Sequence, residues 1–216
     1  MASLADTSGR NGTAPRGQDG LTGLSDLAHA RLTMQRWQRD WPKGGPPFPM
    51  RAMLIAIGRI DRVNVAYGET AGDSALIEIA RRIRHFAEDE LESGVWLAAR
   101  ISGDSFLLAA REDCSRERWQ WLAEALADGI AMPIVDPAMG HSLRLWPRIA
   151  LLRAREGDDA DSVLDTLAET AVRMRRSPGE RIAWASEDID HRGLSNQQLD
   201  AHLLAAIDRD ELEVLF

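Results

Sequence analysis

The chain has 216 residues, and its 44% hydrophobic and 28% charged residues are the balance of one globular domain with appendages, not of a disordered or fibrous chain. A formal net charge of −8 argues against nucleic-acid binding, because neutralising phosphates requires clustered cations in excess. One cysteine excludes an intramolecular disulfide, and five scattered histidines show no metal-ligand spacing. No apolar run reaches the roughly 20 residues of a membrane span, so we expect a cytoplasmic protein.

The first part of the chain is expected to hold a flexible segment, a helix and a strand. Residues 1–18 are mostly small and polar and have almost nothing to bury, which predicts a flexible lead-in, and we expect the folded domain to span residues 19–186. Apolar residues recur at helical spacing over residues 24–41 and predict a helix closed by a proline. Residues 50–57 form a short apolar run, which is typical of a buried central strand.

The middle of the domain is predicted to contain a long helix and a β-hairpin. Asp73 is a good N-cap, and the apolar residues behind it recur at helical spacing. Two apolar runs, residues 94–101 and 106–110, are joined by residues 102–105 (SGDS). A Gly-Asp pair between such runs is a turn signal, so we expect the two runs to pair as adjacent strands.

The second half of the domain continues the alternation of helices and strands. In chain order it is expected to hold a helix from Ser115, extended stretches at 130–135 and 142–152, a helix at 161–176 and a short strand at 181–185. Because proline cannot donate to a sheet ladder, Pro133 and Pro147 favour edge positions for the two extended stretches. The order of elements predicts a layered α+β domain in which helices flank one central mixed sheet of about five strands.

Residues 187–216 are expected to form a separate part. Residues 195–198 (SNQQ) form a capping box in front of an amphipathic helix, and residues 212–216 alternate as a strand would. We interpret this stretch as a linker helix followed by the start of a truncated second domain. The alternative is that the last five residues are vector-derived, because they also look like the beginning of a protease-tag site.

Three motifs in this order resemble those of GGDEF domains. Residues 19–24 (DGLTGL) look like the family's D-x-L-T-G-L opening, residues 63–73 (VNVAYGETAGD) are similar to its I-N-D-x-x-G-H-x-x-G-D segment, and residues 100–106 (RISGDSF) occupy the place of R-x-G-G-D-E-F. The resemblance covers residues 19 to about 185. It implies the layered, nucleotide-cyclase-like GGDEF fold and the condensation of two GTP molecules to cyclic di-GMP by a head-to-head dimer.

The resemblance also implies a damaged metal site. Active members supply two metal-binding carboxylates, one on the first strand and one on the hairpin, and phosphoryl transfer depends on the metal ions that they hold. The first falls on Ala56, whose methyl group ligates nothing, whereas Asp104 keeps an acidic side chain at the second. If Mg²⁺ binds together with GTP, Asp104 and backbone carbonyls are therefore the protein oxygen ligands that remain for it. We expect no useful cyclase turnover.

The hairpin motif departs from the family pattern at two further positions. Ser102 replaces a glycine and Ser105 replaces an acidic residue, while Gly103, Asp104 and Phe106 match the motif. On this comparison the chain offers no complete set of catalytic residues.

Other family contacts to nucleotides are partly kept. The family reads guanine with an Asn and an Asp that fall on Asn64 and Asp73, and Arg176 keeps a cation where a phosphate contact is implied. A carboxylate and an amide suit guanine, since its N1 and N2 hydrogens need acceptors. The product-inhibition motif R-x-x-D corresponds to Ser93 and Trp96, which implies that the inhibitory site is missing.

Simpler structural roles stay open for the same residues. Asp73 could serve as a helix N-cap, and Asn64 could be a turn residue that forms hydrogen bonds with nearby backbone groups. Asp104 could be an ordinary hairpin residue. The seven tryptophans are interpreted as core and edge packing, not as platforms for stacking bases.

The leading hypothesis is a GGDEF domain that is inactive as a cyclase and regulates a following domain. Residues 195–216 resemble the lead helix and first strand of an EAL domain, the cyclic di-GMP phosphodiesterase that often follows a GGDEF domain. GTP binding and self-association are the implied means of regulation. Two alternatives remain: a weakly active cyclase with an altered metal site, and a scaffold that binds no nucleotide.

Overall fold

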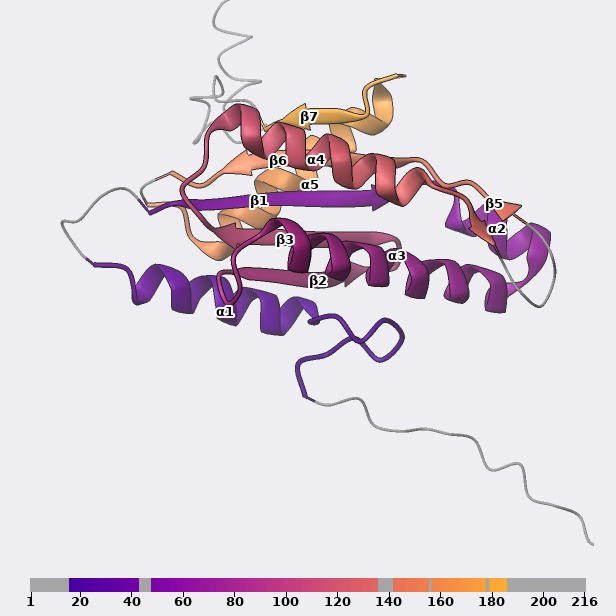
Figure 1. Cartoon of the computed structure of the whole chain (residues 1–216), viewed down its shortest axis with the longest axis horizontal. Coiled ribbons are helices and arrows are strands. Elements are labelled where there is room, and N and C mark those ends of the chain that lie inside the picture. Colours follow the sequence, from indigo (N-terminus) through magenta and orange to yellow (C-terminus); the bar gives the residue numbers. More distant parts are fainter. Residues whose placement is uncertain (1–15, 43–47, 136–141, 156, 178, 186–216) are drawn as a thin grey trace, which may run out of the picture. The chain divides into compact units, whose positions relative to one another are not determined.

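The computed structural model describes residues 16–42, 48–135, 142–155, 157–177 and 179–185 (Figure 1). Within these ranges every helix is too short or too polar to cross a membrane. The predicted linker helix and the predicted start of a second domain lie outside the described residues, as do residues 1–15 of the predicted lead-in. Gln18, at the end of that lead-in, forms an isolated β-bridge with Ser25, so regular backbone contacts reach back to this residue.

A five-stranded mixed sheet lies at the centre of the domain (Figure 1). Its strands are, in spatial order, β2 (Trp96–Ser102), β3 (Ser105–Arg111), β1 (Met50–Ile57), β6 (Pro147–Arg153) and β7 (Ile182–Trp184). Neighbouring strands are antiparallel except β6 and β7, which run parallel. The predicted α+β architecture with a central mixed sheet of about five strands is confirmed.

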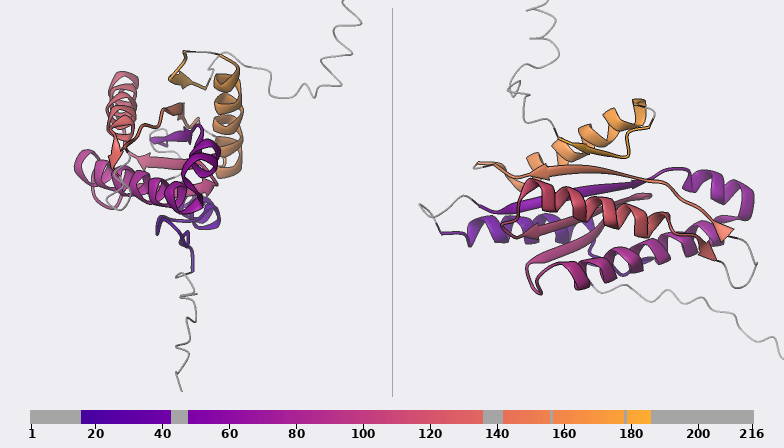
Figure 2. Two further views of the ribbon diagram at one scale, coloured as in Figure 1. Left: turned by 90° about the vertical axis from the view of Figure 1, so that its right-hand side faces the viewer. Right: turned by 45° about the horizontal axis from the view of Figure 1, so that its top comes forward.

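Helices cover both faces of the sheet (Figure 2). The helices α3 (Glu69–Glu90) and α4 (Arg116–Ala131) share a hydrophobic cluster with one face, and α1 (Leu27–Arg39) and α5 (Ala160–Arg176) share a second cluster with the other. The short helix α2 (Ile60–Tyr67) follows the end of β1 and leads directly into α3. The domain therefore has three layers: helices, sheet and helices.

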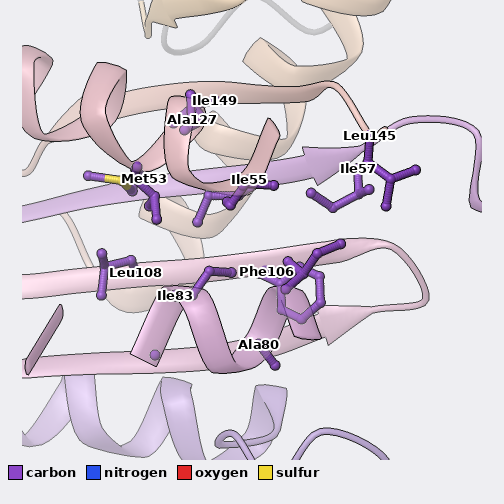
Figure 3. Packing of buried hydrophobic residues seen from close by; sticks show 14 of the residues in the cluster. Met53, Ile55, Ile57, Ala80, Ile83, Phe106, Leu108, Ala127, Leu145 and Ile149 are labelled. Atoms are coloured by element: carbon purple, nitrogen blue, oxygen red, sulfur yellow. The ribbon is translucent and has the colours of Figure 1, made fainter. Parts of the chain in front are cut away.

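The central strand β1 is buried along its whole length because helices cover both of its faces. Met53 and Ile55 belong to the cluster of α3 and α4, where Figure 3 shows them near Phe106 and Ile149 from the neighbouring strands. Leu54 belongs to the opposite cluster, with α1 and α5. A strand covered on both faces reads as a nearly unbroken apolar run, which is why it was predictable from sequence.

Side-chain caps define where three of the helices begin. Asp26, Ser115 and Asp159 precede α1, α4 and α5, and each accepts a hydrogen bond from the backbone N–H three residues later, at 2.7, 3.1 and 2.7 Å. These bonds satisfy backbone donors that a helix start otherwise leaves without partners. The predicted helix start at Ser115 is confirmed.

The start of α3 differs from the prediction. The helix begins at Glu69, and Gly68 is its N-cap. Asp73 therefore lies inside the helix, exposed, and its interpretation as the N-cap is wrong. Gly68 has a φ of 89°, which glycine adopts without steric penalty, so α2 can end and α3 can begin around this single residue.

The proline-containing stretches also differ from the prediction. α4 continues to Ala131, so the extended part of residues 130–135 is β4 (Ile134–Val135), which pairs with β5 (Ser142–Leu143) in a separate two-stranded sheet. β6 lies inside the main sheet, between β1 and β7, and not at an edge. Pro147 is tolerated there because it is the first residue of the strand.

Candidate functional site

The carboxyl end of β1 lies beside the hairpin of β2 and β3. Ala56 pairs with Ser105 of β3, and the backbone N–H of Ile57 donates to the carbonyl of Asp104 at 2.9 Å. The turn of the hairpin is the two-residue loop Gly103-Asp104. Strand pairing therefore brings the predicted first-strand position and the predicted hairpin carboxylate to one edge of the sheet.

A half-buried arginine holds the hairpin turn in place. Arg100 donates from Nη2 and Nε to the carbonyl of Gly103 at 2.7 and 3.2 Å, and from Nη1 to Oδ1 of Asp19 at 3.3 Å. Asp19 also accepts from the backbone N–H and the hydroxyl of Thr22, at 2.8 and 2.7 Å. Burial raises the pKa of the Asp19 carboxyl, but the hydrogen bonds from Thr22 and the charge of Arg100 outweigh it and hold that pKa below its usual value. The first and third sequence motifs are thus joined by an ion pair.

The second motif forms the elbow between α2 and α3. The carboxamide of Asn64 in α2 lies against Gly72 of α3, where an added Cβ would come within 1.8 Å of Asn64 Oδ1. This oxygen is buried and has no hydrogen-bond partner among the described residues. The neighbouring Asp73 is exposed. The elbow therefore contains a buried, unsatisfied amide oxygen and, one residue after Gly72, a solvent-facing carboxylate.

A cavity of about 480 Å³ opens at the end of β1. It is lined by residues from β1 and the start of α2, the hairpin turn, the start of β6 and the end of α5: Ala56, Gly58, Arg59, Asp104, Trp146, Pro147, Arg148, Arg175, Gly179, Glu180 and Arg181. Four of these side chains are arginines and two are carboxylates. The cavity wall carries a net positive charge.

The cavity arginines have few carboxylate partners. Arg181 donates from Nη1 to Asp128 Oδ1 at 2.7 Å, but its Nε and Nη2 are buried and have no hydrogen-bond partner among the described residues. Within the described ranges Arg59, Arg148 and Arg175 form no ion pair with a side chain. Their charge is therefore available to a ligand.

Arg59 also has an unusual backbone conformation. Its φ is 74°, and it is the one described non-glycine residue with a positive φ. This left-handed conformation costs about 1 kcal/mol for a residue with a Cβ. The strained residue lies directly after β1 and in the cavity wall, which places strain at the candidate site.

The hairpin residues of the predicted site are distributed between the cavity and the core. Asp104 lines the cavity and accepts a hydrogen bond from the hydroxyl of Ser105 at 3.1 Å. Ser102 and Gly103 are exposed at the turn, and Phe106 is fully buried in the core (Figure 3). Of this group, Asp104 is the residue that the structure brings to the cavity wall.

The three predicted nucleotide-binding residues lie outside the cavity lining. Asn64 and Asp73 lie at the α2–α3 elbow, and Arg176 is exposed at the end of α5. The adjacent Arg175 lines the cavity instead. The elbow and the cavity are consecutive along the chain, since Arg59 is the residue before α2.

The donor set of the cavity does not fit a divalent cation. Ala56 offers a methyl group, and among the described residues no group of three His, Cys, Asp or Glu side chains is close enough to hold a metal ion. Mg²⁺ takes about six oxygen ligands in a near-octahedral arrangement, and the guanidinium groups around Asp104 oppose a second positive charge. The residues present favour an anion over a metal ion.

A second cavity lies near the positions implied for product inhibition. It measures about 600 Å³ and is lined by residues of α1, α3 and β2, among them His29, Arg84 and Trp96. Trp96 is half-buried, and its ring packs against the core, while Ser93 is exposed before the strand. The paired Arg and Asp of the family motif have no equivalent at these two positions.

Three arginines of the cavity were not singled out from the sequence: Arg59, Arg148 and Arg181. Trp146 is 60% exposed and so lies outside the core, whereas Trp119 is fully buried as expected. Arg148 lies opposite Ala56 in the pairing of β1 with β6. Arg148 belongs to no motif, so the register between the two strands was the signal needed to find it.

Comparison with known proteins gives the family. The model of the family described as diguanylate cyclase, GGDEF domain, matches residues 17–181. The chain belongs to the GGDEF family. The three motifs therefore lie within this GGDEF domain. Membership of this family implies a part in cyclic di-GMP signalling.

Solved GGDEF structures have the same fold. The GGDEF domain of DgcB from Caulobacter crescentus, determined in complex with c-di-GMP, superposes with a TM-score of 0.69 at 17% identity over 79% of this chain and 96% of that one. The GGDEF domain of YfiN (TpbB) from Pseudomonas aeruginosa gives a TM-score of 0.64 at 23% identity over 75% and 98%. At such identities the likeness concerns the fold alone.

Curated relatives are longer than this chain. Uncharacterized proteins of Mycobacterium tuberculosis and Mycobacterium bovis are 26% identical over 199 residues, which is 92% of this GGDEF chain and 30% of each relative. The chain thus spans less than a third of the length of the curated relatives that it matches.

Proposed function

We propose that this GGDEF domain binds GTP without converting it and regulates cyclic di-GMP signalling through a neighbouring EAL phosphodiesterase domain. The observation that carries the proposal is the end of β1, where the methyl group of Ala56 and the single carboxylate of Asp104 stand in the wall of an arginine-lined cavity. The sequence of residues 195–216, which resembles the start of an EAL domain, supports the partner.

The poor metal site argues against turnover. Phosphoryl transfer is catalysed almost entirely by positioning and by metal ions that neutralise the developing charge. The loss of one metal ligand costs several kcal/mol of transition-state stabilisation, on the order of a thousandfold in rate. With Ala56 in the first-strand position, GTP bound here is held and not condensed.

The α2–α3 elbow is the proposed guanine site. The carboxylate of Asp73 accepts from the N1 and N2 hydrogens of guanine, while the carboxamide of Asn64 supplies the complementary contact. Asn64 Oδ1 is buried against Gly72 and has no hydrogen-bond partner among the described residues, so the carboxamide is held at the elbow by close packing. In the proposed pose the triphosphate of the same nucleotide lies toward the cavity, since Arg59 in the cavity wall is the residue before α2, the helix that carries Asn64.

Regulation follows from a shift in population. GTP bound between the elbow and the cavity orders α2, the hairpin turn and the end of α5 together. The domain then has two states, one with these segments ordered and one without, and GTP binds the ordered state more tightly. GTP therefore favours any dimer or interdomain arrangement that is compatible with the ordered state. The neighbouring phosphodiesterase responds to that arrangement.

Isothermal titration calorimetry of the 216-residue chain with GTP and with ATP tests this function. We expect GTP to bind at least about tenfold more tightly than ATP, because ATP leaves the elbow carboxylate without its two donors. Asp73→Asn should remove the preference, while the solvent-facing Asp89→Asn serves as a control on the same helix. Equal affinity for GTP and ATP would contradict guanine recognition.

A weakly active cyclase is the second candidate, and the retained carboxylate of Asp104 in the cavity wall favours it. Incubation with GTP and Mg²⁺ or Mn²⁺ at high protein concentration distinguishes the two. Formation of cyclic di-GMP that Asp104→Ala abolishes supports the cyclase. GTP binding without product supports the regulatory module.

A further inference from the structure

We propose that the cavity at the end of β1 binds the phosphoryl groups of a nucleotide without a divalent cation, with Arg148, Arg175 and Arg181 supplying the positive charge. The identity of the nucleotide rests on the proposed function, whereas the metal-free mode of binding rests on the cavity itself. Arginine side chains thus occupy the role that metal ions have in phosphoryl-transfer sites.

The charge balance of the cavity favours an anion. Its four arginines exceed its two carboxylates, Asp104 and Glu180. Guanidinium groups bind phosphate oxygens through paired N–H donors and stay charged at every physiological pH. A dication placed among them is repelled, whereas a polyphosphate is attracted. The same wall that fits a metal poorly therefore fits phosphoryl groups well.

The pairing of β1 with β6 explains why Arg148 is available. Arg148 is the direct cross-strand partner of Ala56, so the two side chains lie on the same face of the sheet. A carboxylate at position 56 would pair with this guanidinium. The methyl group of Ala56 leaves Arg148 without an ion-pair partner among the described residues and leaves space beside it.

Arg181 is positioned but incompletely satisfied. Asp128 fixes one guanidinium nitrogen at 2.7 Å, while Nε and Nη2 are buried and find no acceptor among the described residues. Buried donors on a charged group that lack acceptors are costly, so an anion in the cavity relieves that penalty. Arg175 reaches the same cavity from the last turn of α5.

The size of the cavity matches such a ligand. A volume of about 480 Å³ lies within the usual range for small-molecule sites, and Arg59 in the cavity wall is the residue before α2. The polyphosphate chain of a nucleotide fits in the cavity while its base remains outside it.

Calorimetry with inorganic tripolyphosphate tests the proposal without involving the base. The full chain is titrated at about 0.15 M ionic strength, once with EDTA and once with Mg²⁺. We expect the affinity in EDTA to equal or exceed that in Mg²⁺, because Mg²⁺ neutralises the anion before the arginines do. Binding that requires Mg²⁺ would overturn the proposal.

Two variants test the assignment of charge. Arg148→Gln should weaken binding of tripolyphosphate in EDTA by about tenfold, whereas Arg153→Gln, at the other end of the same strand and exposed, should not change it. Ala56→Asp should also weaken metal-free binding by about tenfold, because the new carboxylate pairs with Arg148. Unchanged affinity in either cavity variant, with thermal unfolding showing a folded protein, contradicts the proposal.

The outcomes separate this inference from the proposed function. Tripolyphosphate binding in EDTA combined with equal affinity for GTP and ATP supports the metal-free site and overturns guanine recognition. A preference for GTP that appears with Mg²⁺ and vanishes in EDTA supports guanine recognition and overturns the metal-free site.

Discussion

Gly72 shows how one missing side chain shapes the candidate guanine site. A Cβ at this position would lie 1.8 Å from Oδ1 and 2.9 Å from Cγ of Asn64, so the Asn64 carboxamide occupies the space that glycine leaves open. Gly72 is helical and has no positive φ. Close approach, and not backbone freedom, is therefore the reason that a glycine is needed at this position.

We expect Gly72→Ala to change nucleotide preference more than stability. The new methyl group drives the Asn64 side chain out of the elbow, while the gain of about 1 kcal/mol in helix propensity offsets the lost packing. Calorimetry should show that the preference for GTP over ATP falls, and urea unfolding should show a free energy within about 1 kcal/mol of the original protein.

Gly129→Ala is the matched control for this substitution. Gly129 lies in α4 and is exposed, and a Cβ there meets nothing within 4 Å. This variant should be more stable by about 1 kcal/mol with the same nucleotide preference. An unchanged GTP preference in Gly72→Ala would show that the position of Asn64 does not matter for recognition.

At the scale of elements, an arginine of α3 closes the end of α4. Arg82 donates from Nη1 to the carbonyls of Gly129 and Met132 at 3.0 and 2.6 Å, and from Nη2 to that of Pro133 at 3.1 Å. The end of a helix otherwise leaves carbonyls such as that of Gly129 without partners. Glu78 orients the arginine by accepting from its Nε at 2.8 Å, so two turns of α3 and the end of α4 form one polar unit.

The acid stability of the domain should depend on Glu78. The hydrogen bond from Arg81, with that from Arg82, outweighs the effect of burial and lowers the pKa of Glu78 to about 2. Because the folded-state pKa lies below the unfolded value, the stabilisation is complete above the unfolded value of about 4.3 and is lost as the pH falls toward 2.

The Glu78→Gln variant tests this dependence by unfolding in urea at a series of pH values. At pH 7 it should be less stable by about 1 kcal/mol, and its free energy of unfolding should approach that of the original protein near pH 2. Glu88→Gln, an exposed position on the same helix, should follow the original protein throughout. A constant difference between Glu78→Gln and the original protein at all pH values would contradict the assignment.

At the scale of the whole molecule, the ion pair of Asp19 and Arg100 joins the start of the domain to the hairpin at the candidate site. The two residues are 81 positions apart, and the guanidinium also holds the carbonyl of Gly103 in the turn. The segment before α1 therefore stabilises a cavity wall to which it contributes no residue of its own.

We expect Asp19→Ala to loosen the hairpin turn. Amide hydrogen exchange at residues 103–105 should become faster, because Arg100 loses the carboxylate that positions it, and stability should fall by about 1 kcal/mol. Asp26→Ala, which removes the N-cap of α1 in the same segment, should cost a similar amount while exchange in the turn stays slow. Equal acceleration in both variants would contradict a specific tether.

Most of the fold could be predicted from the sequence. Short-range patterns carry the signal for β1, for the hairpin, and for helices with capping residues such as Ser115. The errors arose at a glycine that starts a helix early and at a strand whose place in the sheet is set by long-range pairing. Gly68 starts α3 before Asp73 can cap it, and Pro147 enters the sheet interior because it stands at the first position of β6.

By itself the sequence determined the three GGDEF motifs, the architecture and the alanine at position 56, because each depends on residue types at fixed local spacing. Only the tertiary structure decided which cations surround that alanine. Arg148 reaches the cavity through the register of β6 against β1, and Arg181 through the return of the chain after α5. Long-range strand pairing leaves no local pattern around a single arginine, so charge at the site became visible only once the strands were placed side by side.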